Sequence, residues 1–209
     1  MKFLLPAFVA SSLLAAVPAS AVTIAFQDDF SSYGSSTVTN APDALFNGVW
    51  TTTSGTVDYL AAGSAFDELC PSGQNCIDLD GSTGAGGVFQ TVQAFGAGLY
   101  NVLFQISGNN RGGSDTVTIS FGGVVQSISL AFNQVASQAS FGSAFLGINV
   151  AGSTTLSFAN AGGDNIGIIL KNVTIENADL APVPVPAAGG LLLAALGAVA
   201  ALRRRKAAV

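Results

Sequence analysis

The chain has 209 residues, of which 7 are Lys or Arg, 12 are Asp or Glu and none is His. The absence of histidine excludes Ser-His-Asp and Cys-His catalytic groups and the metal sites that use histidine. Between the two chain ends the basic residues are only Arg111 and Lys171, against all twelve acidic residues. Such an acidic domain is not expected to bind nucleic acid, because contacts to phosphates need clustered Lys and Arg.

The first 21 residues have the pattern of a signal peptide. Lys2 supplies the early charge, residues 3–17 are apolar, and the stretch Pro18 to Ala21 offers an Ala-x-Ala cleavage site. We expect cleavage after Ala21, so that Val22 begins an exported protein. The alternative is an uncleaved membrane anchor, for which the apolar stretch is short.

Residues 22–181 are long enough for one domain with a real core. No stretch in this range has the pattern of a long amphipathic helix. Short runs in which apolar and polar residues alternate dominate it, separated by Gly, Ser, Asn and Asp. The predicted strands are 22–26, 49–53, 56–60, 76–80, 88–93, 99–107, 116–121, 124–130, 140–145, 154–158 and 166–175. These short strands, with turns about every 8–12 residues, predict an all-β fold, an antiparallel β-sandwich.

Individual stretches sharpen this prediction. Residues 31–48 are mostly polar and are predicted to be a loop, and Trp50, the one tryptophan, is predicted to lie in the core. Strand 99–107 is the clearest. In strand 76–80, alternation places Ile77 and Leu79 on one face and the neighbouring aspartates on the other.

The two cysteines, Cys70 and Cys76, are separated by a short polar loop. Because an exported protein meets an oxidising compartment, we expect a disulfide between them that closes this loop. Two free thiols are the alternative.

Three pairs of acidic residues are candidates for chemistry: Asp28 with Asp29, Asp67 with Glu68, and Asp78 with Asp80. Adjacent carboxylates on a strand point to opposite faces, which does not suit a pair of glycosidase acids. Asp78 and Asp80 share a face about 7 Å apart along the strand, and could act as acid and base. Nothing in the sequence around them indicates a substrate pocket, so we expect no enzyme and no catalytic residues. Arg111, in a turn, is expected to pair with Asp115 or a main-chain carbonyl.

Residues 50–58, 70–83, 98–118 and 168–175 resemble exported jelly-roll domains of the galactose-binding-like type. Lys171 stands where that family often has aspartate. The resemblance implies a jelly roll, and such domains often carry a structural calcium between the first and last strands, for which Asp28, Asp29 and Glu176 are the candidate ligands. The alternative is that these three are solvated loop carboxylates and that no metal is bound. No other cofactor is expected.

The C-terminal residues 182–209 combine three features in a fixed order. Val183, Pro184, Val185, Pro186 and Ala187 form an extended motif, because proline is excluded from a helix interior. An uncharged span follows at residues 187–202, about 24 Å long if helical, and a basic cluster closes it: Arg203, Arg204, Arg205 and Lys206. The positive-inside rule places that cluster in the cytoplasm.

This order resembles the VPLPA-CTERM variety of PEP-CTERM sorting signals, with Val185 in place of the usual leucine. The resemblance implies an exosortase as partner, an inner-membrane-anchored precursor, and then a location at the cell surface or outside the cell. A plain membrane anchor is the alternative.

Two functions follow for the exported domain. The first is a non-enzymatic surface or matrix protein, and the alternative is a carbohydrate-binding module for an extracellular polysaccharide. A flat glycan platform needs exposed Trp or Tyr rings, and the domain has only Trp50, Tyr33, Tyr59 and Tyr100. This scarcity favours the first function.

Overall fold

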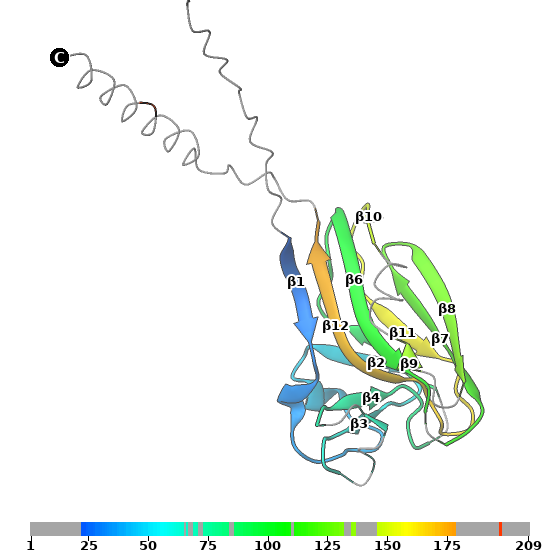
Figure 1. Cartoon of the computed structure of the whole chain (residues 1–209). Coiled ribbons are helices and arrows are strands. Elements are labelled where there is room, and N and C mark those ends of the chain that lie inside the picture. The colour runs from blue at the N-terminus through cyan, green and yellow to red at the C-terminus, as the bar shows by residue number, and fades with distance from the viewer. Residues whose placement is uncertain are drawn as a thin grey trace, which may run out of the picture. The chain divides into compact units, whose positions relative to one another are not determined.

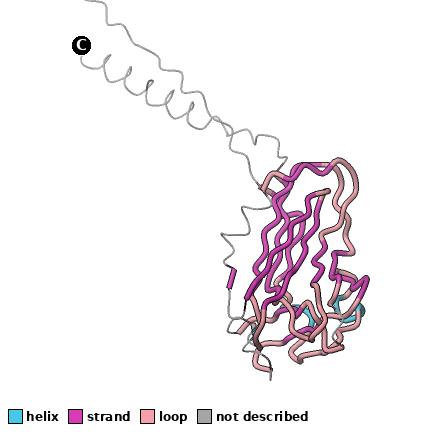
Figure 2. The backbone as a smooth tube through the Cα atoms, turned by 90° about the vertical axis from the view of Figure 1, so that its right-hand side faces the viewer, coloured by secondary structure: helices cyan, strands magenta, loops and turns pink. Residues whose placement is uncertain are grey.

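The computed structural model describes residues 22–64, 66, 69–70, 73–83, 86–109, 111–131, 135–136, 146–178 and 197. Within the chain, Val22–Asp179 forms one compact unit. It is built of two antiparallel sheets, as Figures 1 and 2 show. The predicted all-β sandwich is therefore confirmed.

The first sheet has the strand order β10-β6-β12-β4-β3, with β1 added on β12 and β9 on β6. Its seven strands are β1 Thr23–Asp28, β3 Asp58–Leu60, β4 Cys76–Asp78, β6 Gly98–Ser107, β9 Val135–Ala136, β10 Ile148–Val150 and β12 Ile169–Asn177. Strand β12 is central, and Figure 1 shows it between β6 and β1.

The second sheet has the order β2-β5-β11-β7-β8. Its strands are β2 Trp50–Ser54, β5 Val88–Thr91, β7 Ser114–Phe121, β8 Val124–Ala131 and β11 Ser157–Asn160. Gly122 and Gly123 both have positive φ, which lets β7 turn directly into β8.

Side chains from both sheets meet in one core. Alternation along β6 buries Tyr100, Val102, Phe104 and Ile106, as their spacing predicts. Trp50 is fully buried, and its ring stacks on Phe89 with centroids 4.6 Å apart. Such aromatic pairs add to the stabilisation that burial alone supplies.

The structure departs from the predicted elements at a few places. The segment predicted as a loop at 31–48 contains two short 3-10 helices, η1 Ser31–Tyr33 and η2 Asp43–Phe46. Strands β9 and β10 are too short to show an alternating pattern and were not predicted. The predicted strand 140–145 lies outside the described residues.

Strand β12 changes its neighbour along its length. Its first residues pair with β4, and from Val173 onward it pairs with β1. Against β6 the register shifts between Leu170 and Asn172, so Lys171 is an extra residue in the ladder. This bulge lies where the sheet passes from β4 to β1.

Candidate functional site

The candidate site lies on the outer face of strands β3 and β4. Alternation turns Tyr59 and Ile77 into the main core, while Leu60 and Cys76 face outward. The outward face is nevertheless buried, because Leu69 and Cys70 of the following loop cover it and make a second, smaller core. The strand face that alternation assigns to solvent is thus an interior surface.

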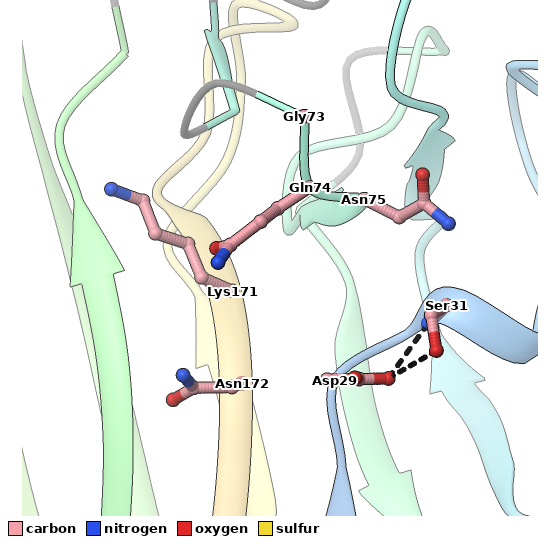
Figure 3. A pocket seen from close by; sticks show the side chains of 7 residues that line it. All are labelled: Asp29, Ser31, Gly73, Gln74, Asn75, Lys171 and Asn172. Atoms are coloured by element: carbon pink, nitrogen blue, oxygen red, sulfur yellow. Dashed lines mark hydrogen bonds between the residues drawn. The ribbon is translucent and has the colours of Figure 1, made fainter.

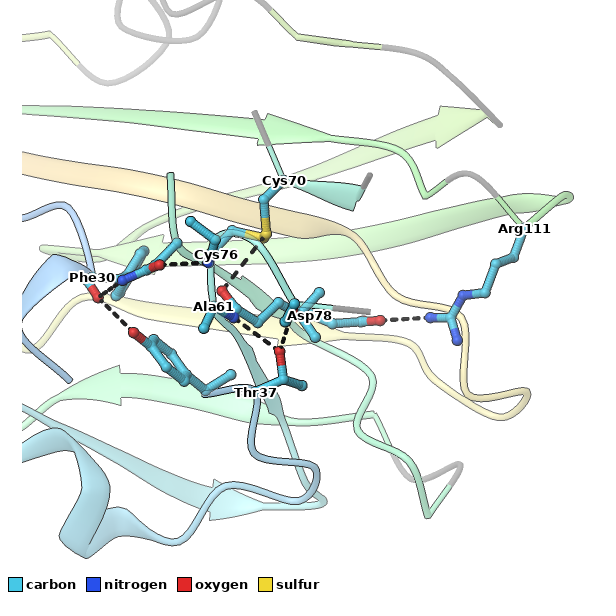
Figure 4. The surroundings of a disulfide bond; sticks show 12 residues. Phe30, Thr37, Ala61, Cys70, Cys76, Asp78 and Arg111 are labelled. Atoms are coloured by element: carbon cyan, nitrogen blue, oxygen red, sulfur yellow. Dashed lines mark hydrogen bonds and ion pairs between the residues drawn. A yellow bond between two sulfur atoms is a disulfide. The ribbon is translucent and has the colours of Figure 1, made fainter. Parts of the chain in front are cut away.

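The disulfide between Cys70 and Cys76 holds this covering loop, which confirms the predicted pairing (Figure 4). The two Cα atoms are 5.7 Å apart, within the range that a disulfide requires. Cys76 belongs to β4, so the bond ties the loop directly to the sheet. The disulfide therefore shapes one wall of the site.

Beside this loop is a hollow that we name the Asp78–Arg111 pocket, with a volume of about 110 Å³. Its lining residues come from β3, β4 and several loops: Thr39, Asp58, Leu60, Phe66, Leu69, Asp78, Ser82, Arg111 and Asn165. Phe66 is 43% exposed, whereas Asp58 and Asp78 are buried. The pocket thus combines one accessible aromatic ring with fixed polar groups.

Asp58 and Asp78 face each other across the β3–β4 ladder but have different partners. The Asp58 carboxylate accepts hydrogen bonds from the main-chain N–H groups of Asn40 and Ser82 and from the Ser82 hydroxyl. Asp58 thereby joins two loops to β3. These hydrogen bonds hold the Asp58 side chain in one position in the lining of the pocket.

Asp78 carries the ion pair of the pocket. Its Oδ2 lies 2.6 Å from Nη2 of Arg111 (Figure 4). Its Oδ1 accepts a hydrogen bond from the Asp80 N–H. Burial raises the pKa of Asp78 to about 7, and the nearby Arg111 charge opposes that rise. The side chain of Arg111 is 34% exposed, so its guanidinium reaches from the buried carboxylate to the pocket surface.

The predicted pairing of Arg111 with Asp115 is corrected by this geometry. Asp115 instead accepts a hydrogen bond from the Asn109 side chain, and Asn109 Oδ1 accepts the Arg111 N–H. The Arg111 side chain pairs with Asp78, which is 33 residues away in the sequence. The sequence favoured Asp115 because it is close to Arg111 along the chain. Only the tertiary structure brings Asp78, at the end of β4, next to the turn that carries Arg111.

The predicted calcium ligands are not brought together. The Asp28 carboxylate accepts bonds from the Phe30 N–H, the Tyr33 hydroxyl and the Trp50 indole N–H, so its oxygens are used inside the core. The Asp29 Oδ1 atom accepts hydrogen bonds from the main-chain N–H and the hydroxyl of Ser31.

Glu176, the third predicted ligand, lies three residues along β12 from the partner of Asp28, which is about 10 Å of strand. Among the described residues, no three acidic, histidine or cysteine side chains form a group that could hold a metal ion. Calcium at Asp28, Asp29 and Glu176 therefore has no support in this geometry.

A second hollow lies over the β12 bulge, with a volume of about 170 Å³. Figure 3 shows its lining: Asp29, Ser31, Gly73, Gln74, Asn75, Lys171 and Asn172. Lys171 is 8% exposed, and burial lowers the pKa of its ammonium group. The lining has no exposed aromatic ring, so it offers less to an organic ligand than the Asp78–Arg111 pocket does.

The rings counted in the sequence as possible glycan platforms are all in the interior. Trp50, Tyr33, Tyr59 and Tyr100 are buried. In the described part of the chain, Phe66 is the only aromatic side chain among the exposed large hydrophobic residues. The described surface therefore has no platform of several rings.

The predicted targeting segments lie outside the described residues. This holds for the cleavage site at Ala21, for the motif 183–187 and for the basic cluster 203–206. The span 187–202 also lies outside, apart from Gly197. No helix among the residues that the structure describes is long and apolar enough to cross a membrane.

Two features of this region could not be found from local patterns. Asn165, with a φ of 62°, lines the pocket from the loop between β11 and β12. Asp80 is fully buried, although alternation alone placed it on an outer face. The Asp-x-Asp spacing of Asp78 and Asp80 was the only sequence feature that marked Asp80. Its burial results from the loops that cover it.

Comparison with known proteins finds no matching family model and no matching curated protein. Among solved structures, the fold is similar to TmCBM61, solved in complex with β-1,4-galactotriose, at a TM-score of 0.39 and 16% identity, over 67% of this chain and 99% of that one. It is also similar to an exo-β-1,3-galactanase from Phanerochaete chrysosporium, solved with β-1,3-galactotriose, at a TM-score of 0.31 and 16% identity. That match covers 68% of this chain and spans 29% of the galactanase. Both likenesses are too distant to indicate a function.

Proposed function

We propose that this chain is an exported, non-enzymatic protein whose β-sandwich binds a carbohydrate in the Asp78–Arg111 pocket. The observation that carries the proposal is the meeting of the exposed Phe66 ring with a guanidinium, two carboxylates and an amide in one hollow. Ligand sites commonly combine an apolar contact surface with a few well-placed polar groups.

The chemistry of a sugar ring suits this lining. The C–H face of a pyranose packs on an aromatic ring, and its hydroxyls both donate to carboxylates and accept from guanidinium groups. Among the described residues, the Arg111 side chain has a recorded bond to Asp78 alone. Since a guanidinium has five N–H donors, the remaining donors of Arg111 are available to sugar oxygens.

The size of the pocket limits what it binds. Its volume of about 110 Å³ is below the roughly 300 Å³ at which sites for drug-sized ligands begin. We therefore expect it to take one sugar unit, such as a chain end or side branch. A hexose with about 12 heavy atoms at roughly −0.3 kcal/mol per atom binds with a Kd on the order of 1 mM.

Charge narrows the class of sugar further. Asp58 and Asp78 line the pocket against the single basic group of Arg111, and the domain as a whole is strongly acidic. Uronic acids and sulfated sugars are repelled by such a surface. We therefore propose a neutral sugar as the ligand.

The test is a glycan array, followed by titration calorimetry of the best neutral sugar, with the full-length chain purified in detergent. Phe66→Ala removes the ring, and Arg111→Lys keeps a charge for Asp78 but loses the planar fork. Each variant should bind at least about tenfold more weakly, which corresponds to about 1.4 kcal/mol. Val125→Ala, at an exposed apolar residue in β8, is the matched control and should bind like the wild type.

Two results would overturn the proposal. One is an array without any neutral-sugar binding, and the other is full affinity in both pocket variants. Circular dichroism and thermal unfolding of each variant separate a lost contact from a lost fold.

The ends of the chain belong to the same proposal. The order of Pro motif, uncharged span and basic cluster at residues 183–206 supports a precursor held in the inner membrane and passed to an exosortase. The resemblance at residues 168–175 supports a jelly roll of the galactose-binding-like type. The protein would then present its sugar pocket at the cell surface or in the matrix.

A further inference from the structure

Asp80 is a fully buried carboxylate without a recorded partner. Its side chain is 0% exposed, and among the described residues neither Oδ1 nor Oδ2 has a hydrogen-bond partner. Asp78, two residues earlier, has bonds on both oxygens. Burying an ionised carboxylate costs several kcal/mol unless a partner compensates the charge. The position therefore requires a compensating group.

The loop between β11 and β12 passes directly over Asp80. A Cβ atom placed on Gly167 would lie 2.9 Å from the Asp80 Cβ, and one placed on Gly162 would lie 3.3 Å from Asp80 Oδ1. Both positions hold glycine, because a Cβ atom would also meet Gly86 N at 2.1 Å from Gly162 and Asp80 N at 2.3 Å from Gly167, so only glycine lets the main chain come this close. The main chain of this loop at Gly162 and Gly167 thus lies against Asp80.

The same loop contributes a second orphan oxygen. Asn165 Oδ1 is buried and has no hydrogen-bond partner in the described part of the chain. Asn160, where the loop begins, uses its Oδ1 to accept the Ile168 N–H, and its Nδ2 is likewise buried without a recorded partner. Of the six such atoms in the described part of the chain, four belong to Asp80, Asn160 and Asn165, and the other two are Thr52 Oγ1 and Asn172 Oδ1.

The surroundings of Asp80 are negatively charged. Burial raises the pKa of Asp115, and the charges of Asp164 and Asp80 raise it further. Asp78 is also close, because its Oδ1 accepts the Asp80 N–H, and its own basic partner is Arg111. The net local charge favours a cation.

We propose that the β11–β12 loop and the end of β4 bind a divalent cation, calcium in preference to others, with the Asp80 carboxylate as its central ligand. Asn165 Oδ1, main-chain carbonyls of the loop and water complete the coordination. Calcium accepts six to eight oxygen ligands of this mixed kind in flexible geometry. Zinc is disfavoured because the loop supplies neither imidazole nor thiolate. The site differs from Asp28, Asp29 and Glu176, and it does not depend on sugar binding.

The first experiment measures calcium binding by the full-length chain after treatment with a chelator. At a Kd of about 0.1 mM, as for extracellular modules, about 10 mM Ca²⁺ should raise the Tm by roughly 5–10 °C. Calorimetry should show one site per chain, and Mg²⁺ should give a smaller shift.

Asp80→Asn tests the central ligand, because it keeps the shape and removes the charge. This variant should bind calcium at least about tenfold more weakly, and without calcium it should be at least as stable as the wild type, since the buried charge is gone. Asp29→Asn is the matched control and should keep the whole calcium response. If Asp80→Asn does not fold, Asn165→Ala takes its place and should weaken binding.

The proposal is overturned if the chelated wild-type chain shows no calcium-dependent change in Tm and no heat of binding. It is also overturned if Asp80→Asn responds to calcium as the wild type does. The two proposals can fail separately. A chain that binds the sugar but no calcium contradicts only the calcium site, and a chain that binds calcium but no sugar contradicts only the proposed function.

Discussion

Asp28 ends strand β1 with a carboxylate that faces the core. It accepts hydrogen bonds from the Phe30 N–H at 2.8 Å and the Trp50 indole N–H at 2.7 Å, and from the Tyr33 hydroxyl. Burial and the Asp28 charge together raise the pKa of Tyr33, so its hydroxyl stays protonated and able to donate. One carboxylate thus connects β1, η1 and β2.

Asp28→Ala should therefore be strongly destabilising. It leaves three donors without their acceptor, and we expect the free energy of unfolding to fall by about 3 kcal/mol. Asp29→Ala is a close control, because the Asp29 bonds to Ser31 are exposed and local; it should cost about 1 kcal/mol or less. Urea unfolding of both variants measures the difference. Equal losses would show that the Asp28 cluster adds nothing beyond a surface turn.

At the scale of the elements, the loop after β3 has an effect larger than its length suggests. Its disulfide to β4 and its Leu69 side chain turn the outer face of β3 and β4 into a second core with Leu60 and Ile169. Buried aspartates are tolerated there because Ser82 and Arg111 supply their partners. The same loop carries Phe66, the exposed ring of the pocket.

Removal of the disulfide should loosen this loop. In the Cys70→Ser/Cys76→Ser variant no disulfide restricts the unfolded chain, so the unfolded state gains conformational entropy. For a separation of 6 residues we expect the free energy of unfolding to fall by about 2 kcal/mol. This lowers the Tm by roughly 4–8 °C. Reducing agent should bring the wild type to the same Tm and leave the double variant unchanged. A wild type indifferent to reduction would show that Leu69 packing alone holds the loop.

At the scale of the whole molecule, the acidic sandwich stands in the sequence between two segments that are predicted to be targeting signals. A membrane anchor needs only an apolar span and a cytoplasmic charge. It does not need an extended Pro motif directly before the span, whereas a processing enzyme can bind such a segment without unfolding a helix. The C-terminal order at residues 183–206 is therefore the basis for proposing that the tail is processed.

Replacing Pro184 and Pro186 by alanine should leave membrane insertion intact and block processing. In a host with the matching exosortase, the wild type should lose residues 187–209 and move outward, while the variant stays in the membrane at full length. Mass spectrometry of the C-terminus and cell fractionation measure both. A wild type that keeps its tail there, with a variant that behaves identically, would show a simple anchor.

The sequence by itself determined the class of fold and much of its content. Period-two alternation, as in Tyr100 to Ile106, is a local property of a strand, so it identified most strands. The burial of Trp50 was predicted from its residue type, as the one tryptophan of the chain. The spacing of Cys70 and Cys76, with the predicted export signal, was sufficient to predict the disulfide.

The tertiary structure alone decided which charges meet. Arg111 pairs with Asp78 because strand order and loop packing bring distant segments together, although Asp115 is nearer in the sequence. Alternation names the face of a residue but not what covers that face, so the burial of Asp58 and Asp80 could not be predicted. The pocket and the orphan carboxylate both follow from covering loops, whose positions depend on contacts across the whole sandwich.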